Sequence, residues 1–178
     1  MAFTFTTLKS AIQDYLESSE TTFVNNLPLI IQQAEQRILR TAQIPDLRKN
    51  VTGTLSKGNP YLAMPTDFLA PYSLAIENNG SEFLLFKDAN FAAELHFMFE
   101  PQSIALAASG TSWLGTNAEM TLLYACLVEG YTFLKGEPEQ MQWYNAKFED
   151  AVSRLKSLGE GYDTTDNYRS GTVRSARI

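Results

Sequence analysis

Two neighbouring segments near the end of the chain, residues 111–136 and 138–158, carry apolar side chains at the three- and four-residue steps of an α-helix. Gly136 and Pro138 form the corner between them, and glycine often ends a helix while proline often begins one. The spacing therefore predicts a helical hairpin from residue 111 to residue 158. The polar tail after it, residues 159–178, offers little for a core, a combination that suits a binding protein better than an enzyme.

The first fifty residues predict two more helices. In residues 6–18 the apolar side chains fall on one face at a period of 3.6, and two serines mark the end. A second helix is expected over residues 26–42, because Asn26 suits the N-cap and Pro28 falls in the first turn, where its missing N–H costs nothing. Pro45 ends this helix.

The middle of the chain changes to the two-residue alternation of β-strands. An Asn79-Gly80 pair between β-prone runs favours a hairpin turn, and two prolines bracket a tight helical turn at residues 66–69. A small, uncharged loop at residues 102–110 can lie against a neighbour. The expected strands are residues 51–55, 61–64, 72–77, 82–86 and 93–99.

The order of these elements predicts a mainly α fold with a small β part, an α+β class. We expect a four-helix bundle with an inserted antiparallel β region and an extended C-terminal arm. The corresponding parts are residues 1–50 and 111–158 for the two halves of the bundle, 51–110 for the β insertion and loop, and 159–178 for the arm.

Charge and cysteine usage narrow the class of protein. The net charge is -6, which argues against a general nucleic-acid-binding protein. Cys126 is the only cysteine, so no disulfide forms within the chain and a reducing compartment is expected. The first residues lack the pattern of a signal peptide, and no apolar run is long enough to span a bilayer, so we expect no membrane partner.

The sequence predicts no catalytic residue, no cofactor and no metal site. His96 is the only histidine and falls on the polar side of an alternating strand. Glu119 and Glu129 resemble an acid/base pair, but solvated or interface-facing charges are the simpler interpretation. Cys126 lies on an apolar helix face and is assigned to the core. No phosphate loop, dinucleotide fingerprint or metal-ligand spacing is present.

The C-terminal tail carries the candidate binding residues, which are Tyr162, Tyr168, Arg169, Arg174 and Arg177. Three interpretations stay open from the residues alone. The tail is a disordered terminus, or an arm that orders on a partner through arginine–carboxylate pairs and tyrosines in pockets. A DNA-binding arm is the third and weakest, because three positive charges meet only about three phosphates.

Several stretches resemble the head-to-tail adaptor proteins of tailed bacteriophages, also called head–tail connectors, and together they span nearly the whole chain. The resemblance is carried by structural motifs, which specify the fold better than any site. The motifs are residues 34–38 (AEQRI), 62–69 (LAMPTDFL), 112–119 (SWLGTNAE), 123–137 (LYACLVEGYTFLKGE), 155–161 (LKSLGEG) and 165–171 (TDNYRSG).

The resemblance implies a structural virion protein at the head–tail junction, assembled in the host cytoplasm. Such adaptors form a dodecameric ring below the portal protein and leave a channel through which DNA passes during genome ejection. The C-terminal arm would bind the portal through Tyr162, Tyr168, Arg169, Arg174 and Arg177. The opposite surface would meet tail nozzle or tail tube proteins and tail fibres. The acidic balance suits a channel that repels phosphate.

One departure from the family pattern concerns the β part. Relatives carry more strand sequence before the segment that matches residues 93–97, whereas residues 87–91 run straight into it here. Either the β part is reduced near residues 90–93 or the sequence omits a stretch.

Ring assembly requires an interface between copies. Trp113 and Trp143 are candidates, because large aromatic side chains anchor interfaces; burial in the bundle core is the alternative. Two other functions are kept beside the adaptor, a particle-borne cell-wall hydrolase and a cytoplasmic assembly factor with a helical bundle.

Overall fold

The computed structural model describes residues 2–42, 44–56, 59, 61–77 and 91–169. The fold is α+β and divides into two compact units. A helical unit combines Met1–Ile44 with Pro101–Ile178, and a sheet unit comprises Pro45–Glu100. The sheet unit therefore begins and ends earlier in the chain than the insertion expected at residues 51–110.

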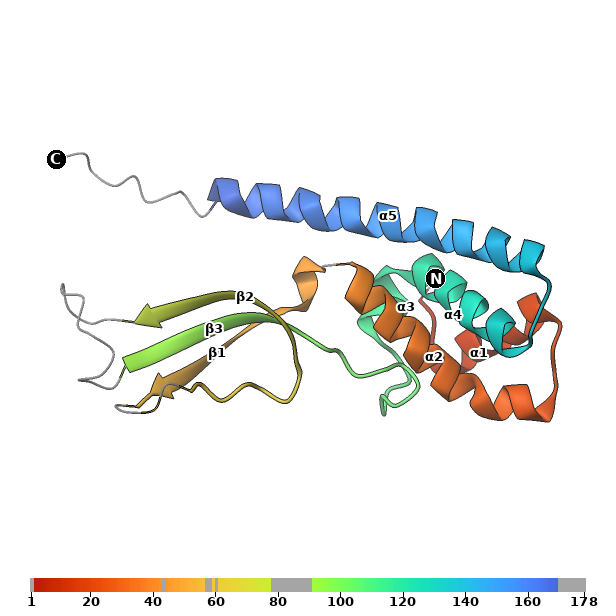
Figure 1. Ribbon diagram of the computed structural model, residues 1–178, viewed down its shortest axis with the longest axis horizontal. Helices are drawn as coiled ribbons and strands as arrows, with labels where there is room; N and C mark the ends of the chain where they lie inside the picture. The colour runs from red at the N-terminus through yellow and green to blue at the C-terminus, as the bar shows by residue number, and fades with distance from the viewer. Residues whose placement is uncertain (1, 43, 57–58, 60, 78–90, 170–178) are drawn as a thin grey trace. The chain divides into compact units, whose positions relative to one another are not determined.

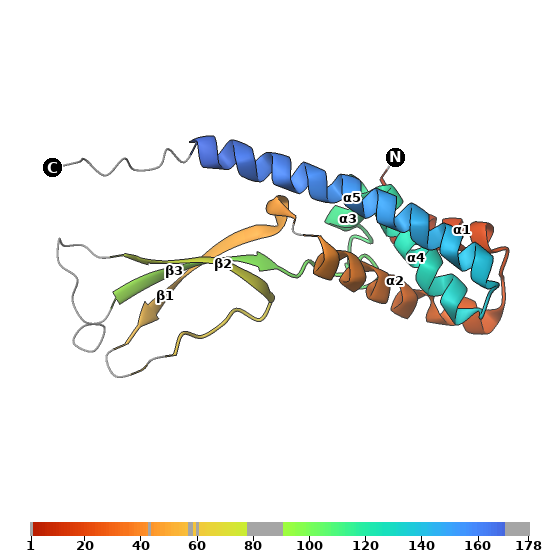
Figure 2. The same ribbon diagram turned by 45° about the horizontal axis from the view of Figure 1, so that its top comes forward.

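The helical unit is built around one central helix. The helices are α1 (Phe5–Leu16), α2 (Thr21–Thr41), α3 (Trp113–Asn117), α4 (Glu119–Phe133) and α5 (Pro138–Arg169). Helix α4 packs against each of the other four, which explains why eight of its fifteen residues are buried. Figures 1 and 2 show α5 antiparallel to α4 along its length. The predicted hairpin is thus confirmed as the α4–α5 pair.

Helix α2 begins at Thr21, earlier than the start predicted at Asn26. Phe23 is fully buried, so the extra turn adds an aromatic side chain to the core. Asn26 is not the cap, since its Nδ2 atom donates to the Thr22 carbonyl oxygen inside the helix at 2.8 Å. Pro28 consequently lies in the helix interior. Burial of Phe23 outweighs the local start signal, because a buried aromatic side chain is worth several kcal/mol, about the cost of an interior proline.

The first arm of the hairpin is broken into two helices, whereas the sequence predicted one. Ser112 caps α3 through its Oγ atom, which accepts the Gly115 N–H at 3.1 Å. Ala118 then leaves the helical conformation, with φ -133° and ψ 43°, before α4 starts at Glu119. At the end of α3, the Asn117 Nδ2 atom donates to the Trp113 carbonyl oxygen at 3.2 Å.

The corner between α4 and α5 uses Lys135 for the left-handed conformation, with φ 54°. The N–H groups of Lys135 and Gly136 donate to the carbonyl oxygens of Thr132 and Tyr131, which closes the end of α4 as a Schellman motif. Gly136 has a different reason to be glycine. A Cβ atom there would lie 2.2 Å from the Tyr131 ring, so the space is already filled.

Helix α5 does not end at residue 158 as predicted but continues to Arg169. Gly159 and Gly161 follow directly after the predicted end, yet a glycine costs a helix only about 1 kcal/mol and does not by itself end one. The first half of the expected extended arm is therefore helical backbone, while residues 170–178 lie outside the described residues. At 32 residues, α5 is about 48 Å long.

The sheet unit contains three antiparallel strands in the order β1-β3-β2. They are β1 (Arg48–Leu55), β2 (Phe68–Glu77) and β3 (Phe91–Phe99), preceded by the short helix η1 (Pro45–Leu47). The predicted alternation in β3 is confirmed from Ala93 to Phe97, where Ala93, Leu95 and Phe97 are buried and Glu94 and His96 partly exposed. It fails at the end of the strand, where Met98 is buried and Phe99 is partly exposed. Figure 1 shows β3 between the other two strands.

Of the strands predicted in this unit, the one at residues 61–64 is wrong and the one at residues 82–86 is untested. Residues 61–64 form no strand, and Leu62 instead packs next to Gly53 of β1. The turn expected at residues 66–69 covers only 66–67, after which β2 begins. Pro71, expected to end that turn, lies in β2, an edge strand whose pairing is irregular there, the setting in which a sheet tolerates proline. Residues 82–86 and the departure near residue 90 lie outside the described residues.

Candidate functional site

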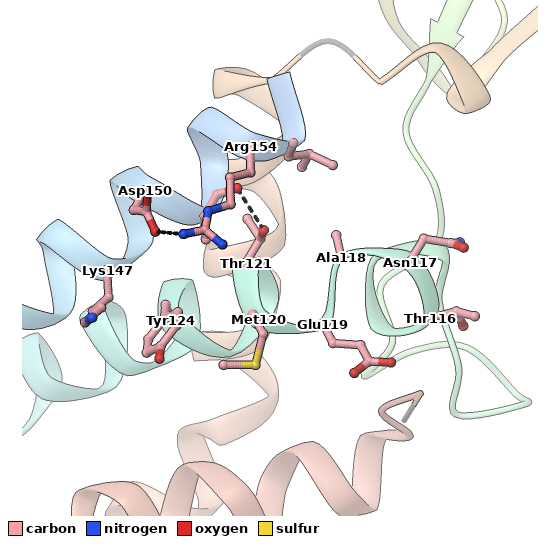
Figure 3. A pocket seen from close by; sticks show the side chains of 12 residues that line it. Thr116, Asn117, Ala118, Glu119, Met120, Thr121, Tyr124, Lys147, Asp150 and Arg154 are labelled. Atoms are coloured by element: carbon pink, nitrogen blue, oxygen red, sulfur yellow. Dashed lines mark hydrogen bonds and ion pairs between the residues drawn. The ribbon is translucent and has the colours of Figure 1, made fainter. Parts of the chain in front are cut away.

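A groove of about 550 Å³ lies between the start of α4 and the middle of α5. Figure 3 shows the side chains that line it, which come from the end of α3 and the start of α4 on one wall and from α5 on the other. Thr121 ties the two walls, because its hydroxyl group donates to the Ala151 carbonyl oxygen at 3.4 Å. The residues used below are Met120, Tyr124, Lys147, Asp150 and Arg154.

The groove combines an apolar floor with a charged rim. Met120 is 48% exposed although it belongs to the central helix, and Tyr124 lies one turn further along the same side. On the rim, Arg154 pairs with Asp150 at 2.9 Å, and both side chains are well exposed. Exposed ion pairs add little stability, so these charges are available to a binding partner.

Trp143 extends this surface along α5. It precedes Lys147, Asp150 and Arg154 at steps of four, three and four residues, which places all four on one side of the helix. Trp143 is 50% exposed, its ring packs edge-on against Tyr144, and the Lys147 Nζ atom lies 5.5 Å from the ring centroid. We call Met120, Tyr124, Trp143, Lys147, Asp150 and Arg154 the groove surface.

The second ring-interface candidate, Trp113, lies on α3, half-buried, and is not among the residues that line the groove. Trp143 does not line the groove itself either, but it shares one side of α5 with the groove residues Lys147, Asp150 and Arg154. Of the two, Trp143 has the exposure expected of an interface anchor.

On another flank of α4, one arginine links three helices. The Arg37 guanidinium of α2 donates to Glu129 Oε1 of α4 at 3.0 Å and to Asn145 Oδ1 of α5 at 3.2 Å. It also lies 4.9 Å from the centroid of the Phe148 ring. Glu129 is thus a partner in a structural ion pair, which accounts for a carboxylate on this apolar helix.

Glu35 is a buried carboxylate that holds the loop before α3 against α2. Its side chain is 5% exposed, and Oε1 accepts the backbone N–H of Ile104, which is itself fully buried. Burial raises the pKa of Glu35, and the hydroxyl groups of Ser103 and Ser112 and the Ile104 bond lower it only in part. Ile104 thus anchors the loop at residues 102–110 to its own helical unit, and the predicted contact of this loop with a neighbour stays a prediction.

Replacing Glu35 by glutamine should change how stability depends on pH. A raised folded-state pKa gives stability that is fully present below the unfolded value of about 4.5 and is lost as pH rises through the folded value. Glutamine does not ionise and keeps an oxygen that accepts the Ile104 N–H. We therefore expect the free energy of unfolding of Glu35→Gln, measured in urea between pH 4 and 8, to rise relative to that of the natural protein as the pH increases.

Glu35→Ala is the matched control, because it also removes the ionisable group but leaves the Ile104 N–H without its acceptor, so its free energy of unfolding should lie about 1–3 kcal/mol below that of Glu35→Gln at every pH. A constant difference between Glu35→Gln and the natural protein over this range would contradict the role assigned to the carboxylate.

The remaining candidates for chemistry are accounted for by structure. Cys126 is fully buried in α4, as predicted, and burial raises the pKa of its thiol well above the usual range. His96 lies on β3 with its Nε2 atom 3.6 Å from Glu94 Oε2. Within the described residues there is no group of three or more His, Cys, Asp or Glu side chains placed to hold a metal ion.

The five predicted arm residues fall in two classes. Tyr162, Tyr168 and Arg169 have helical backbone in α5, whereas Arg174 and Arg177 lie outside the described residues. The groove surface was missed by sequence reasoning except for Trp143. The steps of three and four from Trp143 to Arg154 are visible in the sequence, but charged side chains at this spacing are typical of any solvated helix face.

Comparison with known proteins adds no relative. No protein-family model matches the chain, and no curated protein is significantly similar to it. Among the described residues, no helix has the length and apolar character needed to cross a membrane.

Proposed function

We propose that this chain is a head-to-tail adaptor of a tailed bacteriophage, a structural virion protein that forms a dodecameric ring below the portal. In this proposal the helical unit acts as a four-helix bundle that builds the wall of the ring. The sheet unit is the inserted antiparallel region, and the end of α5 with residues 170–178 is the arm. No catalytic step, cofactor or metal is required.

The observation that carries the proposal is the length of α5. Helix α4 has fifteen residues, about 22 Å, against about 48 Å for α5. Thr121, near the start of α4, bonds the carbonyl oxygen of Ala151, so the residues of α5 after about 155 have passed the end of their partner helix. A helix that outruns its packing partner and leads into a basic tail suits an arm that lies along a second protein.

The other partners follow from the same arrangement. The arm would meet the portal through Tyr162, Tyr168, Arg169, Arg174 and Arg177. The sheet unit would meet tail nozzle or tail tube proteins and tail fibres, and the large apolar side chains exposed on its described residues are suited to such contacts. DNA would only pass through, repelled by a ring of subunits with a net charge of -6 each, and no membrane is involved. These exposed side chains are Val51, Tyr61, Met64, Tyr72 and Leu74.

Quantitative mass spectrometry of purified phage particles tests this function. We expect the chain in mature virions, in a copy number equal to that of the portal protein, and in a portal complex that shows a ring of density by electron microscopy. A chain that is present during assembly but absent from mature virions would instead be a cytoplasmic assembly factor. Release of muropeptides from purified cell walls by the isolated protein would favour the hydrolase.

A further inference from the structure

We propose that the groove surface of one copy receives the outer side of α2 from a second copy. The inference rests on the ring proposed above and names the two surfaces that meet in it. Three observations carry it, namely the unusual composition of the outer side of α2, the position of that side relative to the groove, and the chemistry of the groove rim.

The outer side of α2 is a long exposed stripe almost without charge. Its six residues follow one another at steps of three and four, so they share one side of the helix, and all are exposed. Leu29, in the middle, is 53% exposed, and the only charged member lies at the end of the stripe. We call these residues the α2 stripe: Thr22, Asn25, Leu29, Gln33, Gln36 and Arg40.

Such a stripe is unexpected on a chain with a net charge of -6 unless something covers it. Exposed helix faces are usually charged, whereas the centres of protein interfaces are depleted of charge. A second copy of the same acidic chain is the partner that most needs a carboxylate-free surface, because each acidic residue at the contact would add to repulsion between subunits.

The α2 stripe and the groove open on opposite sides of α4. Helix α2 packs against α4 and reaches Glu129 through Arg37. Met120, in the groove, is nine residues before Glu129, which at about 100° per residue places the two about 180° apart around α4. Two different surfaces on opposite sides of a subunit give a heterologous contact, the kind that closes into a ring.

The groove rim suits an amide-rich partner. The rim carries both signs of charge, because Lys147 and Arg154 are cations and Asp150 is an anion. A partner surface that carried only one sign of charge would be repelled by the residues of like sign. The side-chain amides of Asn25 and Gln33 both donate and accept, and bond to either sign. Leu29 lies between them on the stripe and supplies the apolar group for the floor at Met120 and Tyr124, as in helix-in-groove recognition.

Crosslinking of full-length variants tests the contact. Gln33→Cys and Lys147→Cys are prepared separately, mixed, and treated with a short bismaleimide, and native Cys126 is silent because it is fully buried. We expect covalent dimers in the mixture and none with either variant alone. Ser153→Cys, exposed on the side of α5 that faces away from α4, replaces Lys147→Cys in the control mixture and should give no dimer.

A second variant measures the strength of the contact. Leu29→Arg places a cation opposite Lys147 and Arg154 and should weaken self-association at least tenfold by analytical ultracentrifugation, while thermal unfolding of the monomer stays unchanged. Ser153→Arg adds the same charge elsewhere on the unit and should leave self-association as it is.

The outcomes separate this inference from the adaptor role. Dimers from either cysteine variant alone would show an isologous contact and overturn the inference. Absence of the mixed dimer would also overturn the inference, and so would self-association of Leu29→Arg as strong as that of the natural protein. Either result would do so even if virions contain the chain at the portal. Mixed dimers from a chain that is absent from virions would uphold the contact and remove the adaptor function.

Discussion

Replacing Phe23 by alanine should lower the free energy of unfolding by about 3–5 kcal/mol, the usual cost of removing a buried aromatic ring. Phe23 is fully buried. Its ring centroid lies 6.0 Å from that of Phe133, and the ring packs against Gly130, where an added Cβ atom would lie 3.5 Å from it. The substitution therefore opens a cavity where α2 meets α4, and urea unfolding followed by circular dichroism measures the loss.

The neighbouring residue supplies the control. Thr22→Ala changes an exposed side chain in the same turn and should alter the free energy of unfolding by less than about 0.5 kcal/mol. If α2 began at Asn26, as the local start signal suggested, both substitutions would fall in a connecting loop and cost about the same. A loss below 1 kcal/mol for Phe23→Ala would therefore contradict the early helix start.

Truncation after Gly159 should abolish portal binding, with a loss of at least a hundredfold in affinity, and leave the helical unit folded. Tyr144, Phe148, Val152 and Leu155, the buried side chains in the described part of α5, precede the cut, so the core that they build is retained. The segment removed holds all five residues proposed to contact the portal. Affinity for the portal protein of the same phage is measured by biolayer interferometry, and folding by thermal melting. Binding that survives truncation would refute the role of the arm.

A shorter truncation divides the arm at the end of α5. Removing residues 170–178 deletes Arg174 and Arg177 but retains the helical backbone with Tyr162, Tyr168 and Arg169. Loss of binding with this variant assigns recognition to the basic tail. Retained binding, with loss only on truncation after Gly159, assigns it to the helical segment.

Elements with long, regular periodicity were predictable from the sequence. The apolar spacing in α4, α5 and β3 is sustained over several turns or pairs, and it predicted the type and approximate position of each element, but not the break before α4 or the true end of α5. Element ends were not predictable where local signals disagreed with packing. Asn26 and Pro28 gave a strong start signal, but burying Phe23 is worth more, and two glycines failed to stop α5. The break at Ala118 carries no local signal, since alanine favours helix.

The candidate site was mostly hidden from sequence reasoning for a different reason. Met120 sits in a helix that is apolar almost all round, so nothing local distinguishes it from its buried neighbours. Its exposure depends on where the other helices contact α4, which only the assembled unit fixes. Trp143 was predicted from its residue type alone, because tryptophan is enriched among the residues that anchor interfaces. The charged residues of α5 can be assigned to a site only from the fold, which places Met120 and Tyr124 in the same groove as Lys147, Asp150 and Arg154.

The irregular β2 strand has a consequence for the behaviour of the protein at high concentration. Pro71 lacks an N–H, and register shifts lie on both sides of Ala70–Pro71, so this edge of the three-stranded sheet is a poor template for a further strand. Strand β1, on the other edge, pairs regularly along its whole length and carries no proline. A sheet with one receptive edge joins one other sheet and then stops, whereas amyloid growth needs two. Copies of the protein at high concentration are thus protected from polymerising through their sheets.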